Sequence, residues 1–220
     1  MCHDALECTD SLQYTIVMRT VTAYGKAFLV LAAGVGWHMS APWLAERASD
    51  TFPTIHDVVL DQLPFVDLFG VGEVAFFVLL ALFAYVHLGR QRQELPTVLT
   101  LLGIFYGLRG FFLLLLPIGA PVDAPALADR FELYPYASHA YFPGGHIGIL
   151  LLMTLTVRNR SWRTFFVCTI LLFGLGSMLT RSHYTADVLG GLMLGYGIWL
   201  WGRQSPWFQR FVGDDSERHS

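Results

Sequence analysis

The sequence has few charged residues and few cysteines. Only 14% of its 220 residues are charged, against about 25% in an ordinary soluble domain. With 14 Lys and Arg against 17 Asp and Glu the net charge is −3, which argues against a basic nucleic-acid-binding protein. The three cysteines, Cys2, Cys8 and Cys168, form neither a disulfide framework nor a Cys-x-x-Cys zinc motif. Hydrophobic residues make up 54% of the chain, so disorder is also excluded.

Long hydrophobic stretches take up much of the chain. A helix that crosses a bilayer needs about 20 mostly apolar residues, and a soluble helical bundle does not account for so many stretches of this kind. We therefore predict an all-α polytopic membrane protein that forms one six-helix domain over residues 1–220, with a short N-terminal segment at 1–20 and a C-terminal tail at 206–220. The six predicted transmembrane helices are residues 21–38, 66–88, 96–117, 144–157, 164–180 and 184–202.

The positions of lysine and arginine predict the orientation, because cytoplasmic loops are enriched in these residues. With the N-terminus in the cytoplasm, ten of the 14 lie on the cytoplasmic side, three lie outside, and Arg109 lies within a predicted helix. Both termini are therefore predicted to be cytoplasmic. The ten are Arg19, Lys26, Arg90, Arg92, Arg158, Arg160, Arg163, Arg203, Arg210 and Arg218, and the three are Arg47, Arg130 and Arg181.

Five ionisable residues in the predicted helices, or at their ends, form the candidate site. A charged group inside a membrane is costly, and it is usually functional or paired. With the predicted orientation all five lie toward the external or luminal face, so we expect them to converge in one leaflet. A buried salt bridge of Arg109 with Glu73 or Asp187 is an alternative that is compatible with a shared site. The five are Glu73, Arg109, His146, His183 and Asp187.

His183 and Asp187 are four residues apart at the start of the last predicted helix, which places them on one helical face. A carboxylate beside one imidazole nitrogen fixes the tautomer and leaves the other nitrogen basic. Such a pair suits a histidine nucleophile or a general base. A structural His–Asp hydrogen bond explains the same spacing equally well, and the sequence alone leaves both interpretations open.

The second histidine follows a glycine pair. Pro143-Gly144-Gly145-His146 opens a predicted helix, where glycines let the backbone approach a ligand and unpaired N–H groups face an anion. The Arg109 guanidinium matches phosphate oxygens. Together these groups indicate phosphoryl chemistry without a metal or other cofactor, in which one histidine attacks phosphorus and the other protonates the leaving oxygen. A metal site of His146, His183 and Asp187 is the alternative, although the spacing matches no metal motif.

Several segments resemble those of a known family. Phe142-Pro-Gly-Gly-His146 and Ser182-His-Tyr-Thr-Ala-Asp187-Val188 resemble the second and third motifs of the type-2 phosphatidic acid phosphatase superfamily. The chain is more similar to the sphingomyelin synthase branch, in which a Gly-His motif opens the fourth helix and His-Tyr-Thr/Ser-x-Asp-Val opens the sixth. Leu108-Arg109-Gly110 and Leu60-Asp-Gln-Leu-Pro64 also resemble segments of that branch. The resemblance covers about residues 52–202.

This resemblance implies six helices, membrane lipids as substrates, and an active site on the external or luminal side. It implies a phosphohistidine intermediate on His183, which Asp187 orients, with His146 as acid or base toward the leaving and entering hydroxyls. Arg109 would bind phosphate, and Glu73 would position a group or an alcohol acceptor. The remaining candidates for substrate binding are Gly144, Gly145 and Tyr184.

Departures from the superfamily pattern favour transfer over hydrolysis. The Lys-x6-Arg-Pro motif is absent, and Gly144 stands where the phosphatases have serine. We therefore expect a lipid phosphotransferase or a head-group-cleaving enzyme. Lipid phosphate phosphatase is the first alternative, and a non-catalytic lipid-binding or transport protein is the second. Gly191 and Gly195 permit close helix packing, either within one protomer or between the protomers of a homo-oligomer.

Overall fold

The described part of the chain is all-helical. The computed structural model describes residues 5–49, 51–68, 70–121 and 142–213, and no strand is found among them. Arg130 and Arg218, which the charge count used, lie outside these residues. The helices are α1 (Ala5–Ala48), α2 (Val58–Gln62), α3 (Val71–Arg90), the short 3-10 helix η1 (Arg92–Glu94), α4 (Leu95–Leu115), α5 (Gly145–Thr156), α6 (Arg160–Leu179), α7 (Thr185–Gln204) and α8 (Pro206–Val212).

Four segments of the described chain are long and apolar enough to cross a membrane, which indicates a multi-pass membrane protein. Helix α5 is apolar but has only 12 residues. Helix α7 has 20 residues, but its glycines and Asp187 lower its hydropathy, and it is not among the four. The four are Val17–Ala48, Val71–Arg90, Arg92–Leu115 and Arg160–Leu179.

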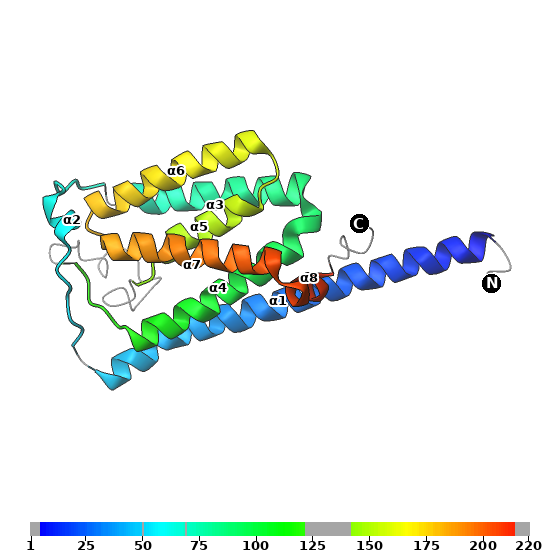
Figure 1. Cartoon of the computed structure of the whole chain (residues 1–220), viewed down its shortest axis with the longest axis horizontal. Helices are drawn as coiled ribbons and strands as arrows, with labels where there is room; N and C mark the ends of the chain where they lie inside the picture. Colours follow the sequence, from blue (N-terminus) through cyan, green and yellow to red (C-terminus); the bar gives the residue numbers. More distant parts are fainter. Residues whose placement is uncertain (1–4, 50, 69, 122–141, 214–220) are drawn as a thin grey trace.

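Helices α3, α4, α6 and α7 run between the same two ends of a bundle, and α1 continues well beyond one of these ends (Figure 1). Helix α2 and its flanking segments lie at one end, whereas α8 lies at the other, beside the middle of α1. Helix α1 packs along α4, and α5 packs along α7. The α1–α4 contact is close because Gly34 and Gly103 meet there: a Cβ on Gly34 would lie 2.0 Å from the Gly103 carbonyl oxygen.

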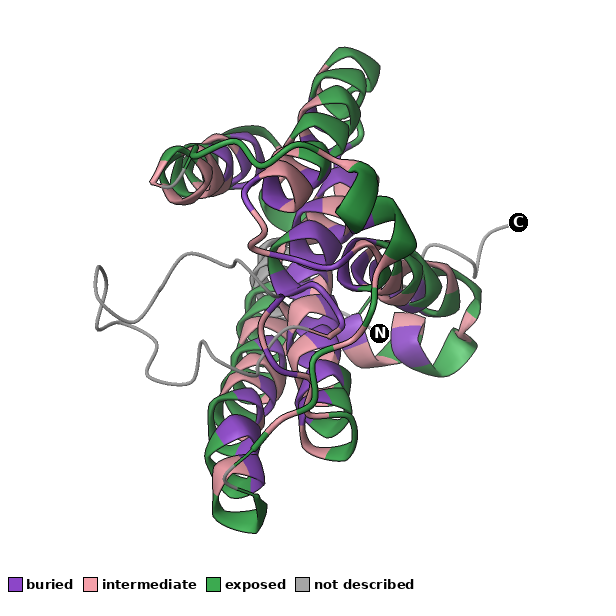
Figure 2. Cartoon of the chain, turned by 90° about the vertical axis from the view of Figure 1, so that its left-hand side faces the viewer, coloured by how far each residue is buried: buried purple, intermediate pink, exposed green. Residues whose placement is uncertain are grey.

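Helix α5 is the central element. One apolar cluster lies on its Ile147 and Leu150 face, against α3, α6 and α7, and a second includes its Ile149 and Leu152 with α4, α7 and α8. An apolar helix without a polar face is expected to be buried on all sides, and Figure 2 shows buried residues gathered in the middle of the bundle with exposed ones on the outer faces. Many outer residues are themselves apolar, for example Leu172 (70% exposed) and Met193 (75% exposed). Such a surface fits contact with lipid rather than water.

Several helix bounds differ from those predicted. Helix α3 begins at Val71 instead of residue 66, because Gly70 before it adopts a left-handed backbone (φ +84°). Helix α1 begins far earlier than residue 21, so most of the predicted N-terminal segment is helical.

The predicted C-terminal tail begins as a helix. Ser205 accepts a hydrogen bond from the Phe208 N–H at 3.2 Å and Pro206 occupies the first turn, which together start α8. Phe208 is fully buried, so this part of the tail packs against the bundle.

Candidate active site

A glycine seam between α5 and α7 brings the two histidine motifs together. A Cβ on Gly191 would lie 2.3 Å from the Gly144 carbonyl oxygen, and one on Gly195 would lie 2.6 Å from the Gly148 carbonyl oxygen. Only glycine allows backbones to approach this closely. The Gly144 N–H also donates to the Asp187 carbonyl oxygen at 2.9 Å. The first turns of the two helices are therefore held side by side.

His146 and His183 face each other across this seam. Their ring centroids are 6.2 Å apart. His146 is exposed. Its ring packs edge-on against Phe76 of α3, with the ring centroids 4.3 Å apart, and its centroid lies 6.3 Å from that of Phe173 of α6. His183 is buried, with 9% of its surface exposed. An imidazole of α5 and one of the connection between α6 and α7 thus lie next to each other.

Asp187 supports His183 from within the first turn of α7. Its Oδ2 lies 3.4 Å from His183 Nδ1 and accepts the Tyr184 backbone N–H at 2.9 Å. Asp187 is fully buried, and its Oδ1 has no hydrogen-bond partner among the described residues. The predicted contact between residues four apart is therefore present, and the carboxylate also caps the start of α7.

Arg109 lies in the last two turns of α4 and is buried, with 6% exposed. Its Nε donates to the Pro143 carbonyl oxygen at 2.7 Å, and its NH1 lies 2.9 Å from His38 Nε2. A Cβ on Gly145 would lie 2.9 Å from Arg109 Nε, so the glycine before His146 makes room for the guanidinium. The structure thus gives Gly144 and Gly145 packing roles, and their predicted contact with substrate stays a prediction.

His38 is a site residue that the sequence analysis missed. It lies on α1, 71 residues before Arg109, and is 5% exposed. Because a guanidinium only donates hydrogen bonds, the His38 ring nitrogen that faces it must accept, which requires a neutral imidazole. The one sequence signal was a histidine inside an apolar helix, and it gave no hint of its partner.

Glu73 lies at the edge of the site. It is the third residue of α3, nearer the helix start than predicted, and it is partly buried. Phe76, which contacts His146, lies three residues later on the same helical face. Glu73 is therefore about one turn farther out than His146. Tyr184, the other predicted substrate-binding residue, is 1% exposed, and its hydroxyl accepts the Ile55 N–H at 3.4 Å.

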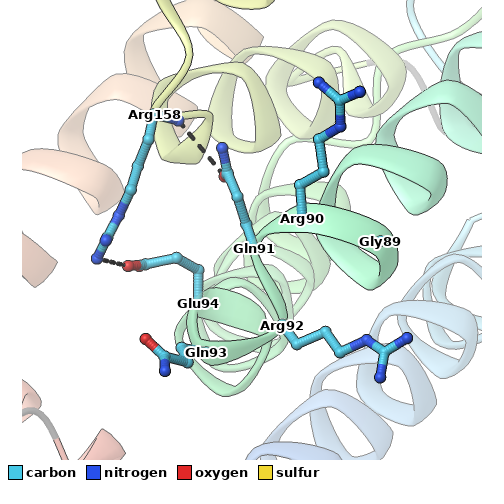
Figure 3. A pocket seen from close by; sticks show the side chains of 7 residues that line it. All are labelled: Gly89, Arg90, Gln91, Arg92, Gln93, Glu94 and Arg158. Atoms are coloured by element: carbon cyan, nitrogen blue, oxygen red, sulfur yellow. Dashed lines mark hydrogen bonds and ion pairs between the residues drawn. The ribbon is translucent and has the colours of Figure 1, made fainter.

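A cavity of about 350 Å³ lies far from these residues, between the end of α3, η1 and the residue Arg158. Arg158 follows the C-terminal end of α5, so the cavity is at the opposite end of that helix from His146. Figure 3 shows the Arg90 and Arg92 side chains extending away from one another, while Arg158 pairs with Glu94. The cations do not converge on a common point, and no predicted site residue lines this cavity.

Among the described residues, no group of three His, Cys, Asp or Glu side chains could hold a metal ion. His146, His183 and Asp187, the metal site considered as an alternative, do not form such a group. In comparisons with known proteins, no family model matches the chain and no curated protein matches it.

Proposed function

We propose that the chain is an integral membrane enzyme that transfers or cleaves a phosphate-bearing head group of phospholipids or sphingolipids, in the manner of a sphingomyelin synthase. The observation that supports this best is the pair of imidazoles at 6.2 Å, one of them backed by a buried carboxylate. Two rings this close can both reach one phosphate-bearing head group, so that one attacks phosphorus while the other transfers a proton.

The proposed reaction has two steps. In the first, His183 attacks phosphorus, a nitrogen–phosphorus bond forms, and the bond from phosphorus to the lipid alcohol oxygen breaks. His146 gives its proton to that oxygen. In the second step, an acceptor hydroxyl gives its proton to His146 and attacks phosphorus, which breaks the nitrogen–phosphorus bond and regenerates His183. A lipid alcohol as the acceptor gives transfer, and water as the acceptor gives hydrolysis.

The surrounding residues have distinct roles in this reaction. Asp187 lies beside Nδ1 of His183, which orients the ring and stabilises the positive charge that the ring acquires when its other nitrogen bonds to phosphorus. Arg109 lies against Gly145 and supplies positive charge for the phosphoryl oxygens. Glu73, one turn farther out, would position the acceptor.

We further propose six membrane spans, formed by α1, α3, α4, α5, α6 and α7, with both termini in the cytoplasm. The start of α8 and the N-terminal half of α1 lie at one end of the bundle, and the histidine site lies toward the other (Figure 1). The exposed arginines Arg90, Arg92 and Arg158 lie at the α8 end, which fits a cytoplasmic assignment. The site would then face the periplasm, the exterior or an organelle lumen.

The test uses purified protein with labelled phosphatidylcholine, phosphatidylethanolamine and phosphatidic acid, each with and without ceramide or diacylglycerol. We expect His183→Ala to abolish turnover, and His146→Ala to reduce it strongly. The matched control is His56→Ala, because His56 forms an exposed pair with Asp61 at 2.7 Å. Turnover of every substrate by His183→Ala, or lipid binding without turnover that is insensitive to His146→Ala, would contradict the proposal.

A further inference from the structure

The segment that joins α1 to α3 contacts the α6–α7 connection on both sides of His183. This connection, residues 180–184, is not helical. Two residues before His183, the Arg181 guanidinium donates to the carbonyl oxygens of Leu60 and, at 3.0 Å, Leu63. Two residues after it, the Thr185 N–H donates to Asp57 at 2.6 Å. These contacts join residues more than 115 positions apart in the sequence.

Asp57 serves two helix starts at once. Its Oδ1 accepts the N–H groups of Val59 (3.2 Å) and Leu60 (3.0 Å), which caps α2. Its Oδ2 accepts the N–H of Thr185, the first residue of α7. Each of these N–H groups lies in a first helical turn and has no partner within its own helix. One carboxylate thus connects the segment between α1 and α3 to α7, the helix that carries Asp187.

Arg181 holds a backbone conformation that needs support. Its φ is +56°, a value that non-glycine residues rarely adopt, and such conformations persist where surrounding contacts hold them. The two carbonyl contacts of its guanidinium supply that support. The Tyr184 hydroxyl adds a third cross-contact by accepting the Ile55 N–H at 3.4 Å.

We propose that Ile55, Asp57, Leu60 and Leu63 form a positioning clamp that fixes His183 for attack, with Asp57 and Arg181 as positioning residues. The clamp itself rests on hydrogen bonds alone, whereas its effect on turnover rests on the function proposed above. The nucleophile lies on a short connection between two helices, where its backbone N–H donates to the Ser177 carbonyl oxygen at 3.3 Å. The contacts of Arg181 and Thr185 add support on both sides of it. Loss of the clamp therefore displaces His183 relative to His146 without removing any reacting group.

The first pair of variants breaks the Asp57–Thr185 contact from each side. Asp57→Asn has only one acceptor oxygen, so it can accept from the first turn of α2 or from the Thr185 N–H. The amide nitrogen then faces the other N–H group, donor against donor. Thr185→Pro removes the donor at the first helical position, where proline is favoured. The matched control is Asp61→Asn, which changes a carboxylate of α2, the helix that Asp57 caps, and this carboxylate pairs with exposed His56.

A third variant separates backbone strain from the clamp. Arg181→Gly relieves the positive φ, since glycine adopts it readily, yet it removes both carbonyl contacts. If the guanidinium served only to offset its own backbone strain, this variant would behave like the wild type. The clamp instead predicts that it behaves like Asp57→Asn.

The activity-independent measurement is hydrogen exchange of the segments 55–63 and 180–188, followed by mass spectrometry. We expect an increase of about tenfold or more in exchange for Asp57→Asn, Thr185→Pro and Arg181→Gly, and none for Asp61→Asn. The Asp57 and Thr185 changes should not add in the double variant, because they remove one contact. Unchanged exchange in all three variants, or an equal increase in Asp61→Asn, overturns the clamp.

Turnover then tests positioning. A displaced nucleophile lowers kcat by about 10- to 100-fold with little change in KM, whereas lost lipid binding raises KM. Increased exchange with wild-type kcat overturns the positioning role. Increased exchange in a protein whose wild-type form turns over no lipid supports the clamp and refutes the proposed function, so the two failures are distinguishable.

Discussion

Substitution of Gly191 by alanine tests the seam on which the site depends. The new Cβ would lie 2.3 Å from the Gly144 carbonyl oxygen, whereas ordinary contacts begin at 3.4 Å. The obstacle is backbone and cannot rotate away, so α5 and α7 must separate by about 1 Å. Gly144 directly precedes α5 and its histidine, so the displacement reaches His146. A misplacement of about 1 Å costs about 100-fold in turnover, and overpacking costs about 1–3 kcal/mol of stability.

The control for this experiment is Gly197→Ala on the same helix. Gly197 is exposed and a Cβ there would meet nothing within 4 Å, so this variant gains helix propensity worth about 0.5–1 kcal/mol without any steric conflict. Both variants are purified in the same detergent, and their thermal unfolding and lipid turnover are measured side by side. We expect Gly191→Ala to unfold at a lower temperature and to lose most turnover, and Gly197→Ala to match the wild type or exceed its stability. Equal stability and equal turnover of the two variants would refute the seam.

Three further predictions concern the residues around the site. Gly145→Ala places a Cβ 2.9 Å from Arg109 Nε and should reduce turnover more than stability in the same two assays; an unchanged rate contradicts the contact. His38→Ala removes the acceptor for Arg109 and should lower the free energy of unfolding by about 1–3 kcal/mol. His38→Gln keeps an acceptor and should lower it less. Partial burial raises the pKa of Asp57, but hydrogen bonds from backbone N–H groups outweigh it and hold this pKa below its ordinary value of 3.8. The stabilisation of the fold by the ionised Asp57 carboxylate is therefore complete above pH 3.8 and is lost as the pH falls through the lowered pKa. Hydrogen exchange of residues 180–188 should consequently rise in acid for the wild type. An identical acid profile for Asp57→Asn would contradict this.

Local patterns in the sequence were the reliable ones. The proximity of His183 and Asp187 was predicted from their four-residue spacing, and the contact forms although His183 lies just before α7. The positions of α4, α5, α6 and α7 were predicted within a few residues for a similar reason, since the lengths of apolar stretches are a local property. By contrast, the start of α3 was predicted five residues early because the left-handed backbone at Gly70 interrupts an apolar stretch without changing its hydropathy.

Contacts between residues far apart in the sequence could not be predicted and became known only from the tertiary structure. The sequence left open whether Gly191 and Gly195 pack within one protomer or between two, and the structure places them against Gly144 and Gly148 of the same chain. His38 had no predictable partner because Arg109 is 71 residues away on another helix.

By itself, the sequence determined a helical chain with apolar spans and two histidine motifs, because hydropathy and helical spacing depend on near neighbours alone. Only the tertiary structure decided that α5 and α7 pack too closely for any side chain at Gly191 or Gly195, that His38 accepts from Arg109, and that the segment before α3 contacts both sides of His183. Those contacts depend on how helices pack in three dimensions, and packing is a property of all the helices together.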